Sequence, residues 1–226
     1  MASQPAIAHP AATVVLLRDG REGLEVLLVQ RNAQLAFHGG AWVFPGGRLD
    51  PEDYAGGDAA DVVNAARNAA VREAKEEAGI EVLPQRLVLF SRWVTPEPVP
   101  KRFDTWFFAA SCAAGDVCVD GGEIHAFQWL SPRAALEGQQ AGTLDLPPPT
   151  FVTITQLNRG GDVAATLAAL AAAPPETFLP RLNSVNGVPC TLYHGDVAYE
   201  DGDTSRSGPN HRLILHPSGW KYERSR

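Results

Sequence analysis

The strongest constraint on the fold is the run Arg72-Glu73-Ala74-Lys75-Glu76-Glu77-Ala78-Gly79-Ile80. Glu73, Glu76 and Glu77 are spaced i, i+3 and i+4, so a helix places their three carboxylates on one face. Like charges this close destabilise a helix unless a positive charge lies beside them. The run therefore predicts a helix with an acidic face that needs a cationic partner.

This helix is expected to begin at Asp58 or Asp61, since either side chain can cap the free N–H groups of the first turn. Gly79 stands where a glycine commonly ends a helix, which predicts Ala78 as the last helical residue. Small side chains recur along one side and would let the helix pack closely on a sheet. They are Ala65, Ala66, Ala69 and Ala70.

A divalent cation is one candidate for the partner of the acidic face. Mg²⁺ and Mn²⁺ take oxygen ligands and keep places for water and substrate phosphates, which would make this face a site of phosphoryl chemistry. The alternative is a solvated face on which Arg72 and Lys75 balance the glutamates. The helix alone leaves both interpretations open.

The residues before the helix extend the pattern. Phe44-Pro45-Gly46-Gly47, together with the Arg72 to Ile80 run, resembles the Nudix box, which marks hydrolases of a nucleoside diphosphate linked to another group. The sequence departs from that box where Asp53 replaces the family's Glu and where Ala74 replaces a larger aliphatic residue. About eleven extra residues also precede Arg72, and they predict a loop extension ahead of the helix.

A second resemblance concerns the substrate. Leu27, Leu28, Arg31, Leu35, His38, Gly40 and Phe44 to Gly47 fall at the spacing of a motif in Nudix enzymes that cleave coenzyme A (CoA) and its thioesters. Later segments look like the peroxisomal-type acyl-CoA diphosphatases and their bacterial relatives; they are Trp93 to Pro96, Arg102 to Thr105, Phe107-Phe108, Asp120 to Glu123 and Leu146 to Thr150. This resemblance, over about residues 10 to 170, implies cleavage of CoA or acyl-CoA to adenosine 3′,5′-bisphosphate and (acyl-)phosphopantetheine.

The resemblance also implies a metal and catalytic set. Mg²⁺ or Mn²⁺ would be held by Gly47, Glu73, Glu76 and Glu77, whose carboxylates Arg72 would orient. Glu123 would serve as a further acidic ligand or as the base, with Glu77 as the alternative base. As a residue of a glycine-rich loop, Glu123 can equally be an exposed side chain without a catalytic role.

Four residues are candidates for contact with the substrate: Arg31, His38, Arg102 and Phe103. The guanidinium groups of Arg31 and Arg102 suit the diphosphate and the 3′-phosphate of CoA, and His38 suits a phosphate contact. Phe103 can stack on adenine, or it can be an ordinary core aromatic residue of a strand.

The composition favours a small nucleotide as the partner. A net charge of -7 argues against nucleic-acid and anionic-membrane partners. The sequence also lacks the run of about twenty apolar residues that a transmembrane helix needs. Its three cysteines have neither metal-ligand spacing nor a disulfide framework, which predicts reduced core residues in a cytoplasmic protein.

The order of strand and helix patterns predicts an α/β fold. Strands are expected at 13–17, 24–30, 41–44, 86–94, 105–112, 124–130, 191–194 and 211–216, and further helices from Ser131-Pro132, at 150–158 with Thr150 as cap, and at 162–173. With the resemblance, this implies a Nudix α/β/α sandwich with a mixed central sheet, followed by C-terminal helices and a short β tail. We expect residues 1–180 to form the Nudix hydrolase domain and 181–226 an appendage, whose role in edge pairing, homodimer contact or substrate cover is open.

Two other functions remain compatible with the sequence. One is a Nudix pyrophosphatase for NADH or ADP-ribose. The other is a non-catalytic module that senses nucleotides, which loss of a ligand glutamate would favour; all three glutamates are present.

Overall fold

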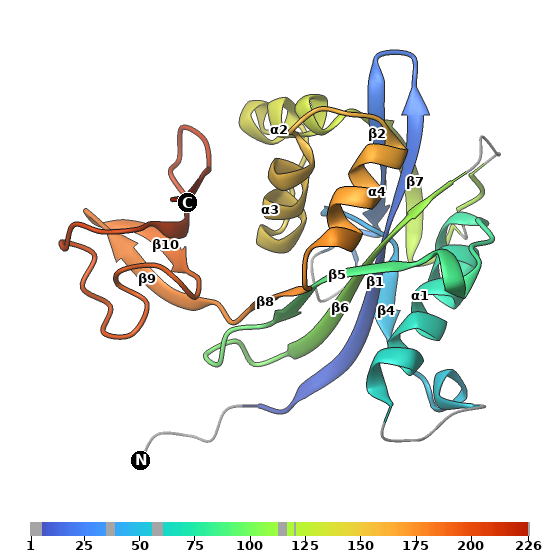
Figure 1. Cartoon of the computed structure of the whole chain (residues 1–226), viewed down its shortest axis with the longest axis horizontal. Coiled ribbons are helices and arrows are strands. Elements are labelled where there is room, and N and C mark those ends of the chain that lie inside the picture. The colour runs from blue at the N-terminus through green and yellow to red at the C-terminus, as the bar shows by residue number, and fades with distance from the viewer. Residues whose placement is uncertain (1–5, 35–38, 56–60, 113–116, 120, 226) are drawn as a thin grey trace.

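The computed structural model describes residues 6–34, 39–55, 61–112, 117–119 and 121–225. Its larger sheet has eight strands, with the path β3-β2-β1-β6-β5-β8, to which β4 adds by pairing with β1 and β7 by pairing with β2. The β1–β6 and β5–β8 pairs are parallel, and the other pairs are antiparallel. This is the mixed central sheet that the sequence predicts (Figure 1).

The elements have the following bounds. The first sheet contains β1 (Ala8–Gly20), β2 (Gly23–Arg31), β3 (Trp42–Val43), β4 (Gly46–Arg48), β5 (Val88–Val94), β6 (Arg102–Ser111), β7 (Ile124–Leu130) and β8 (Glu176–Phe178). The helices are α1 (Val62–Ala78), α2 (Pro132–Ala141), α3 (Pro148–Leu157) and α4 (Val163–Ala172), with 3₁₀ turns η1 (Pro51–Tyr54) and η2 (Pro84–Arg86). The second sheet contains β9 (Arg181–Val185), β10 (Val188–Leu192), β11 (His211–Ile214) and β12 (Lys221–Arg224).

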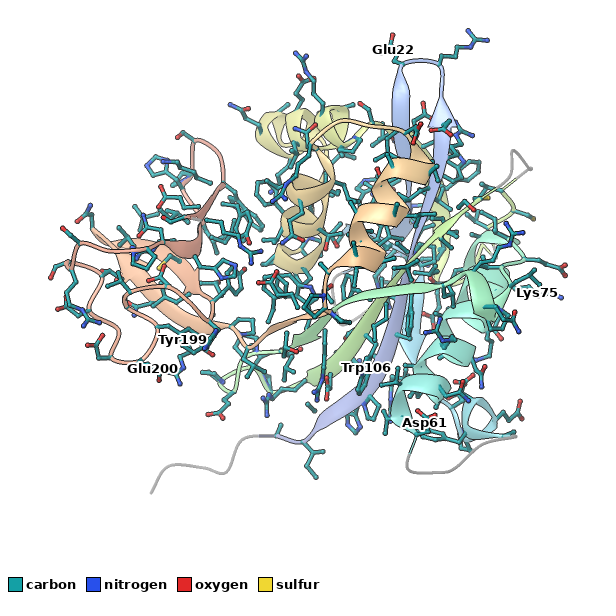
Figure 2. All side chains as sticks on the ribbon, in the orientation of Figure 1. Glu22, Asp61, Lys75, Trp106, Tyr199 and Glu200 are labelled. Carbon is teal, nitrogen blue, oxygen red and sulfur yellow. The ribbon has the colours of Figure 1, made fainter. Side chains whose placement is uncertain are left out.

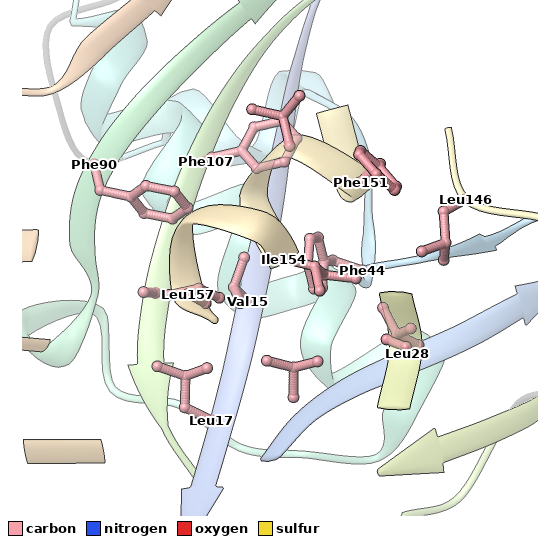
Figure 3. Close-up of a cluster of buried hydrophobic side chains, with 14 of the residues drawn as sticks. Val15, Leu17, Leu28, Phe44, Phe90, Phe107, Leu146, Phe151, Ile154 and Leu157 are labelled. Atoms are coloured by element: carbon pink, nitrogen blue, oxygen red, sulfur yellow. The ribbon is translucent and has the colours of Figure 1, made fainter. Parts of the chain in front are cut away.

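Strand β1 divides the hydrophobic core into two layers, because successive side chains of a strand point to opposite faces. Val14 and Leu16 pack with the alanine face of α1, and Val15 and Leu17 pack with α2, α3 and α4. Figure 3 shows the second layer, in which Phe151 and Ile154 belong to α3. The predicted α/β/α sandwich is thereby confirmed.

Helix α1 follows its sequence-based prediction closely. The Asp61 side chain accepts a hydrogen bond from the Asn64 N–H, and Gly79 has the left-handed φ of 68° that favours glycine. Figure 2 labels Asp61 at the start of the helix and Lys75 in its last turn. The alternative start, Asp58, lies outside the described residues.

The predicted start of α3 at Thr150 is wrong. The helix begins at Pro148, with Pro147 as the preceding cap residue, because prolines in the first turn give up only N–H groups that lack helical partners there. Thr150 lies inside the helix and is buried. The predicted caps of the neighbouring helices are confirmed, since Ser131 accepts from the Ala134 N–H and Asp162 from the Ala165 N–H.

The second sheet is antiparallel, in the order β12-β11-β10-β9. A buried ion pair joins this sheet to the loop between β10 and β11. Nε and Nη2 of Arg212, on β11, each lie 2.7 Å from a carboxylate oxygen of Asp196 in that loop. Burial opposes the charge of Asp196, but these bonds and two from backbone N–H groups outweigh it and lower its pKa. The polar segment 200–210 is hydrogen-bonded to β9 through Asn183 and Thr204.

The two sheets share a core, because Tyr193 of the region after β10 and Leu213 of β11 belong to the same buried cluster as Val15. The division at residue 180 coincides with the start of β9 and stays a prediction. None of the helices in the described ranges is long and apolar enough to cross a bilayer.

The three cysteines carry no disulfide. Cys190 is buried, as expected for a core residue, and Cys112 is partly buried. Cys118 is exposed, so the core prediction is wrong for that residue, which follows β6 in a loop. The cytoplasmic location inferred from the cysteines stays a prediction.

Candidate functional site

A cleft of about 1030 Å³ runs along the molecule and brings distant parts of the chain together. One end is lined by Glu73, Glu76 and Glu77 of α1, with Gly46 and Gly47 of β4 beside them. This volume lies at the upper limit of ordinary ligand pockets, about 300–1,000 Å³, so it fits an extended ligand.

Gly46 and Gly47 allow strand β4 to lie close to both β1 and α1. Gly46 and Gly47 pair with Thr13 and Ala12 of β1. A Cβ on Gly47 would lie 2.2 Å from Glu73 Oε1, and the Gly46 N–H donates a 2.9 Å hydrogen bond to Glu77 Oε2. The absence of side chains therefore allows the backbone of β4 to contact both carboxylates directly.

Arg72 organises the acidic face. Its Nη1 lies 2.9 Å from both Glu73 Oε1 and Glu76 Oε2. Its Nε and Nη2 lie 3.2 and 3.0 Å from the two oxygens of Asp53, and Nη2 also donates to the Arg48 carbonyl oxygen. Burial opposes the charge of Arg72, but the bonds with Asp53 and Glu73 outweigh it and raise the pKa of Arg72.

Two of the carboxylates are buried and unfavourably placed for carrying charge. Glu73 is 9% exposed and Glu77 is 6% exposed. Burial, joined by repulsion from Glu73 and Glu123, raises the pKa of Glu77 to about 8 against the lowering effects of the Gly46 N–H and Arg31. Burial likewise raises the pKa of Glu73, despite the nearby charge of Arg72. A cation bound here would favour the charged form of both groups.

Glu76 differs from its two neighbours. Its side chain is 58% exposed, and its bond to Arg72 is the i, i+4 pair that an ordinary solvated helix face would also form. The helix therefore combines a buried carboxylate pair, Glu73 and Glu77, with an exposed ion pair between Arg72 and Glu76.

Glu123 and Arg31 meet at the same end of the cleft. Their Oε2 and Nη2 atoms are 3.7 Å apart, and the Glu123 side chain is 64% exposed. The Asn32 N–H donates to the Glu123 carbonyl oxygen, which ties the loop before β7 to the end of β2. Arg31 Nε is buried and has no hydrogen-bond partner among the described residues. Arg31 therefore places a positive charge between Glu77 and Glu123.

The other predicted substrate contacts differ in position. Phe103 lines the cleft, with Lys101 Nζ 5.5 Å from its ring centroid. Arg102 is not among the described residues that line the cleft, and it donates to the Thr95 and Ala6 carbonyl oxygens; its role as a phosphate contact stays a prediction. His38 lies outside the described residues.

The donor chemistry suits a hard divalent cation, although the described residues contain no preformed cluster of three His, Cys, Asp or Glu side chains able to hold a metal. Glu73 and Glu77 offer buried oxygen donors next to the main chain of Gly47, while Arg72 engages Glu73 and Glu76. Oxygen donors are the ligands that Mg²⁺ and Mn²⁺ prefer.

Sequence reasoning missed the role of Asp53. This residue is 4% exposed in η1 and accepts both hydrogen bonds from the Arg72 fork. Its position, the sixth after Gly47, coincides with the acidic residue of the Nudix box and could have indicated it. The extra residues after Asp53 thus leave this acidic partner in reach of Arg72.

The NUDIX domain family matches residues 8–148. The crystal structure of a NUDIX hydrolase from Alicyclobacillus acidocaldarius is similar with a TM-score of 0.65 and 26% identity, covering 75% of this chain and 99% of that one.

Two curated relatives carry named substrates. Peroxisomal coenzyme A diphosphatase ndx-8 of Caenorhabditis elegans is 41% identical over 80 residues, which are 35% of this chain and 30% of that protein. Acyl-coenzyme A diphosphatase NUDT19 of Xenopus laevis is 34% identical over 73 residues, which are 30% of this chain and 19% of that protein. The match spans less than a third of the length of either relative.

The contact between Asp53 and Arg72 predicts a stability effect. Asp53→Asn should lower the free energy of unfolding by about 1.5–3 kcal/mol, because it removes charge-assisted hydrogen bonds from a buried site. Asp50→Asn is the matched control: Asp50 is 59% exposed, lies 3.7 Å from Arg72, and asparagine caps a turn equally well. Urea unfolding of the two variants checks this, and equal stabilities would contradict the assigned role of Asp53.

Proposed function

The chain belongs to the NUDIX domain family, and on that premise we propose that it is a divalent-metal-dependent hydrolase that cleaves the diphosphate of CoA or acyl-CoA. The products would be adenosine 3′,5′-bisphosphate and phosphopantetheine or its acyl form. The observation that carries the proposal is the buried Glu73 and Glu77 pair at one end of a cleft large enough for an extended ligand.

In this proposal, Glu73 and Glu77 hold Mg²⁺ or Mn²⁺ with the main chain at Gly47, and the more exposed Glu76 completes the set. A bound divalent cation supplies neutralisation of phosphate charge and activation of water. The protein's own contribution is to keep Glu73 and Glu76 in place through Arg72, which also balances part of their charge, and Glu77 through the Gly46 N–H.

Two residues across from α1 would act on the substrate. Glu123 is sufficiently exposed to accept a proton from the attacking water, and it faces the carboxylate end of the cleft. Arg31 would bind the diphosphate rather than the 3′-phosphate, because it lies beside Glu77 and Glu123, where the bond is broken.

The CoA assignment draws support from three sources: the motif around Arg31, the similarity to proteins named as CoA and acyl-CoA diphosphatases, and the size of the cleft. Cytoplasmic location and a homodimer stay predictions. The test is turnover of CoA, acyl-CoA, NADH and ADP-ribose side by side with Mg²⁺ and with Mn²⁺, with the products separated by chromatography. Cleavage of NADH or ADP-ribose without cleavage of either CoA species would overturn the CoA assignment and keep the hydrolase, and no turnover at all would favour a nucleotide-sensing module.

Removal of one metal-binding carboxylate should abolish most of the activity without unfolding the protein. We expect Glu77→Gln or Glu76→Gln to lower kcat by about a hundredfold or more, because each removes a ligand whose charge acts in the transition state. The stability of the metal-free Glu77→Gln protein should not fall, since glutamine keeps the shape of the buried side chain and cannot carry the negative charge that burial and the neighbouring carboxylates disfavour. Glu81→Gln is the control, because Glu81 is 80% exposed and pairs with Lys75 away from the cleft. Full activity in both ligand variants would refute the metal assignment.

The position of Arg31 predicts how its loss affects two substrates. Arg31→Ala should reduce kcat/KM by roughly tenfold to a hundredfold, the value of one charge-assisted contact of about 1.5–3 kcal/mol. The reduction should be similar for CoA and for dephospho-CoA, because both carry the diphosphate. Steady-state kinetics on the two substrates checks this. A loss confined to CoA would instead place Arg31 at the 3′-phosphate.

A further inference from the structure

The second sheet reaches the same cleft as the glutamates. Pro180, Leu182, Thr191, Tyr193 and Leu215 line it together with Glu73 and Glu77, and none of these five is charged. All five lie beyond residues 8–148, the part that matches the NUDIX domain family. These five residues therefore lie outside the segment that matches the family.

The pairing of β9, β10 and β11 decides which side chains face the cleft. Leu182 is opposite Thr191, and Thr191 is opposite Leu213, so these three share one face of the sheet. The opposite face carries Cys190 and Leu192, which pack with Tyr199 in a separate cluster. Figure 2 labels Tyr199, which lies in the loop between β10 and β11. The residues of this face that line the cleft are thus uncharged, with Leu182 and Leu215 as its aliphatic members.

Tyr193 anchors this face to the first sheet. Its ring makes an edge contact with Trp93 of β5 at 5.6 Å and with Phe178 of β8 at 5.3 Å, and Trp93 stacks on Phe178 at 3.9 Å between centroids. Because this aromatic cluster is buried, the sheet is held in a fixed position at the end of the cleft. Leu182, on edge strand β9, remains 56% exposed although its side chain is apolar.

Apolar residues of other elements also line the cleft. Val94, Pro96 and Val99 follow Trp93, which pairs with Phe178 of β8, and Pro147 to Pro149 lie at the start of α3. An exposed leucine in such a ligand cleft is a surface that an apolar group can cover.

The spacing between the two ends suits a CoA thioester. The path β4-β1-β6-β5-β8 places four strand spacings, about 19 Å, between the strand that carries Gly46 and Gly47 and the strand that leads into the second sheet. The pantetheine arm has two amide bonds and a main chain comparable to about four extended residues, about 14 Å. A diphosphate at the glutamates would therefore bring the thioester end to about one strand spacing from β8, so that the acyl chain continues toward Leu182.

We propose that the second sheet supplies a subsite for the acyl chain of a CoA thioester, with Leu182 as a specificity-determining residue. The proposal rests on the proposed function, since it takes the diphosphate to lie at Glu73 and Glu77. Burial of one methylene group in such a subsite can raise kcat/KM up to about fourfold. Acyl-CoA is then a better substrate than CoA, and the advantage grows with chain length until the subsite is filled.

The test is the ratio of kcat/KM for octanoyl-CoA to that for CoA. Leu182→Gln should lower this ratio by about threefold to tenfold, because an amide loses apolar contact with the chain, while Leu182→Met should preserve it. Leu179→Gln is the matched control: Leu179 is 48% exposed, lies three residues earlier and does not line the cleft, so the ratio should not change. Circular dichroism checks that each variant keeps its fold, which the exposure of Leu182 favours.

The outcomes separate the two proposals. If CoA and octanoyl-CoA are cleaved and the ratio in Leu182→Gln equals that of the unmodified protein, the acyl subsite is refuted and the CoA diphosphatase stands. The subsite is also refuted if Leu179→Gln lowers the ratio as much as Leu182→Gln. If neither CoA species is cleaved while ADP-ribose or NADH is, the proposed substrate fails, and the acyl subsite fails with it.

Discussion

The guanidinium of Arg72 is the interaction on which the acidic end of the cleft depends. Its five N–H groups reach the carboxylates of Asp53, Glu73 and Glu76 and the carbonyl oxygen of Arg48. One rigid fork thus joins α1, η1 and β4, which are separate in sequence. Without this charge, several carboxylates would repel one another across the start of the cleft. The acidic surface is therefore a preorganised one, maintained by a residue of the same helix.

Strand β4 sets the second constraint, because it must fit between β1 and α1. Its glycines pair with Ala12 and Thr13, and the space that a Cβ of Gly47 would need is taken by Glu73. The alanine face of α1 works in the same direction, since small side chains bring the helix close to the sheet. The glycines of β4 and the alanines of α1 thus let the helix pack closely on the sheet. The same close packing places the acidic groups of α1 at the cleft.

Features that depend on contacts between residues close in the sequence could be predicted, and features that depend on contacts far apart in the sequence could not. Helix α1 and its boundaries depend on local groups, Asp61 and Gly79, and were predictable from them. Strand β4 and the short strands β8, β9 and β12 were missed, because three to five residues form a strand there only by pairing with partners far along the chain. In the site, spacing identified Glu73, Glu76 and Glu77. The contact of Asp53 with Arg72 crosses an insertion, and the bond from Arg102 to the Thr95 carbonyl oxygen depends on the folded backbone, so neither could be read from local spacing. Whether these residues catalyse a reaction stays a prediction.

The division of the cleft between two parts of the chain has a consequence for how specificity can arise. The charged end is built by α1, β4 and the end of β2, within the segment common to the family. The apolar end is built by a separate sheet, which Tyr193 fixes to Trp93 and Phe178 through buried ring contacts rather than through the charged network. In the described part of the chain, the hydrogen bonds of Arg72 go to α1, η1 and β4, whereas Tyr193 packs on Trp93 and Phe178 through ring contacts. Separate sets of contacts therefore hold the two ends of the cleft, so a substitution at Leu182 should leave the carboxylates undisturbed.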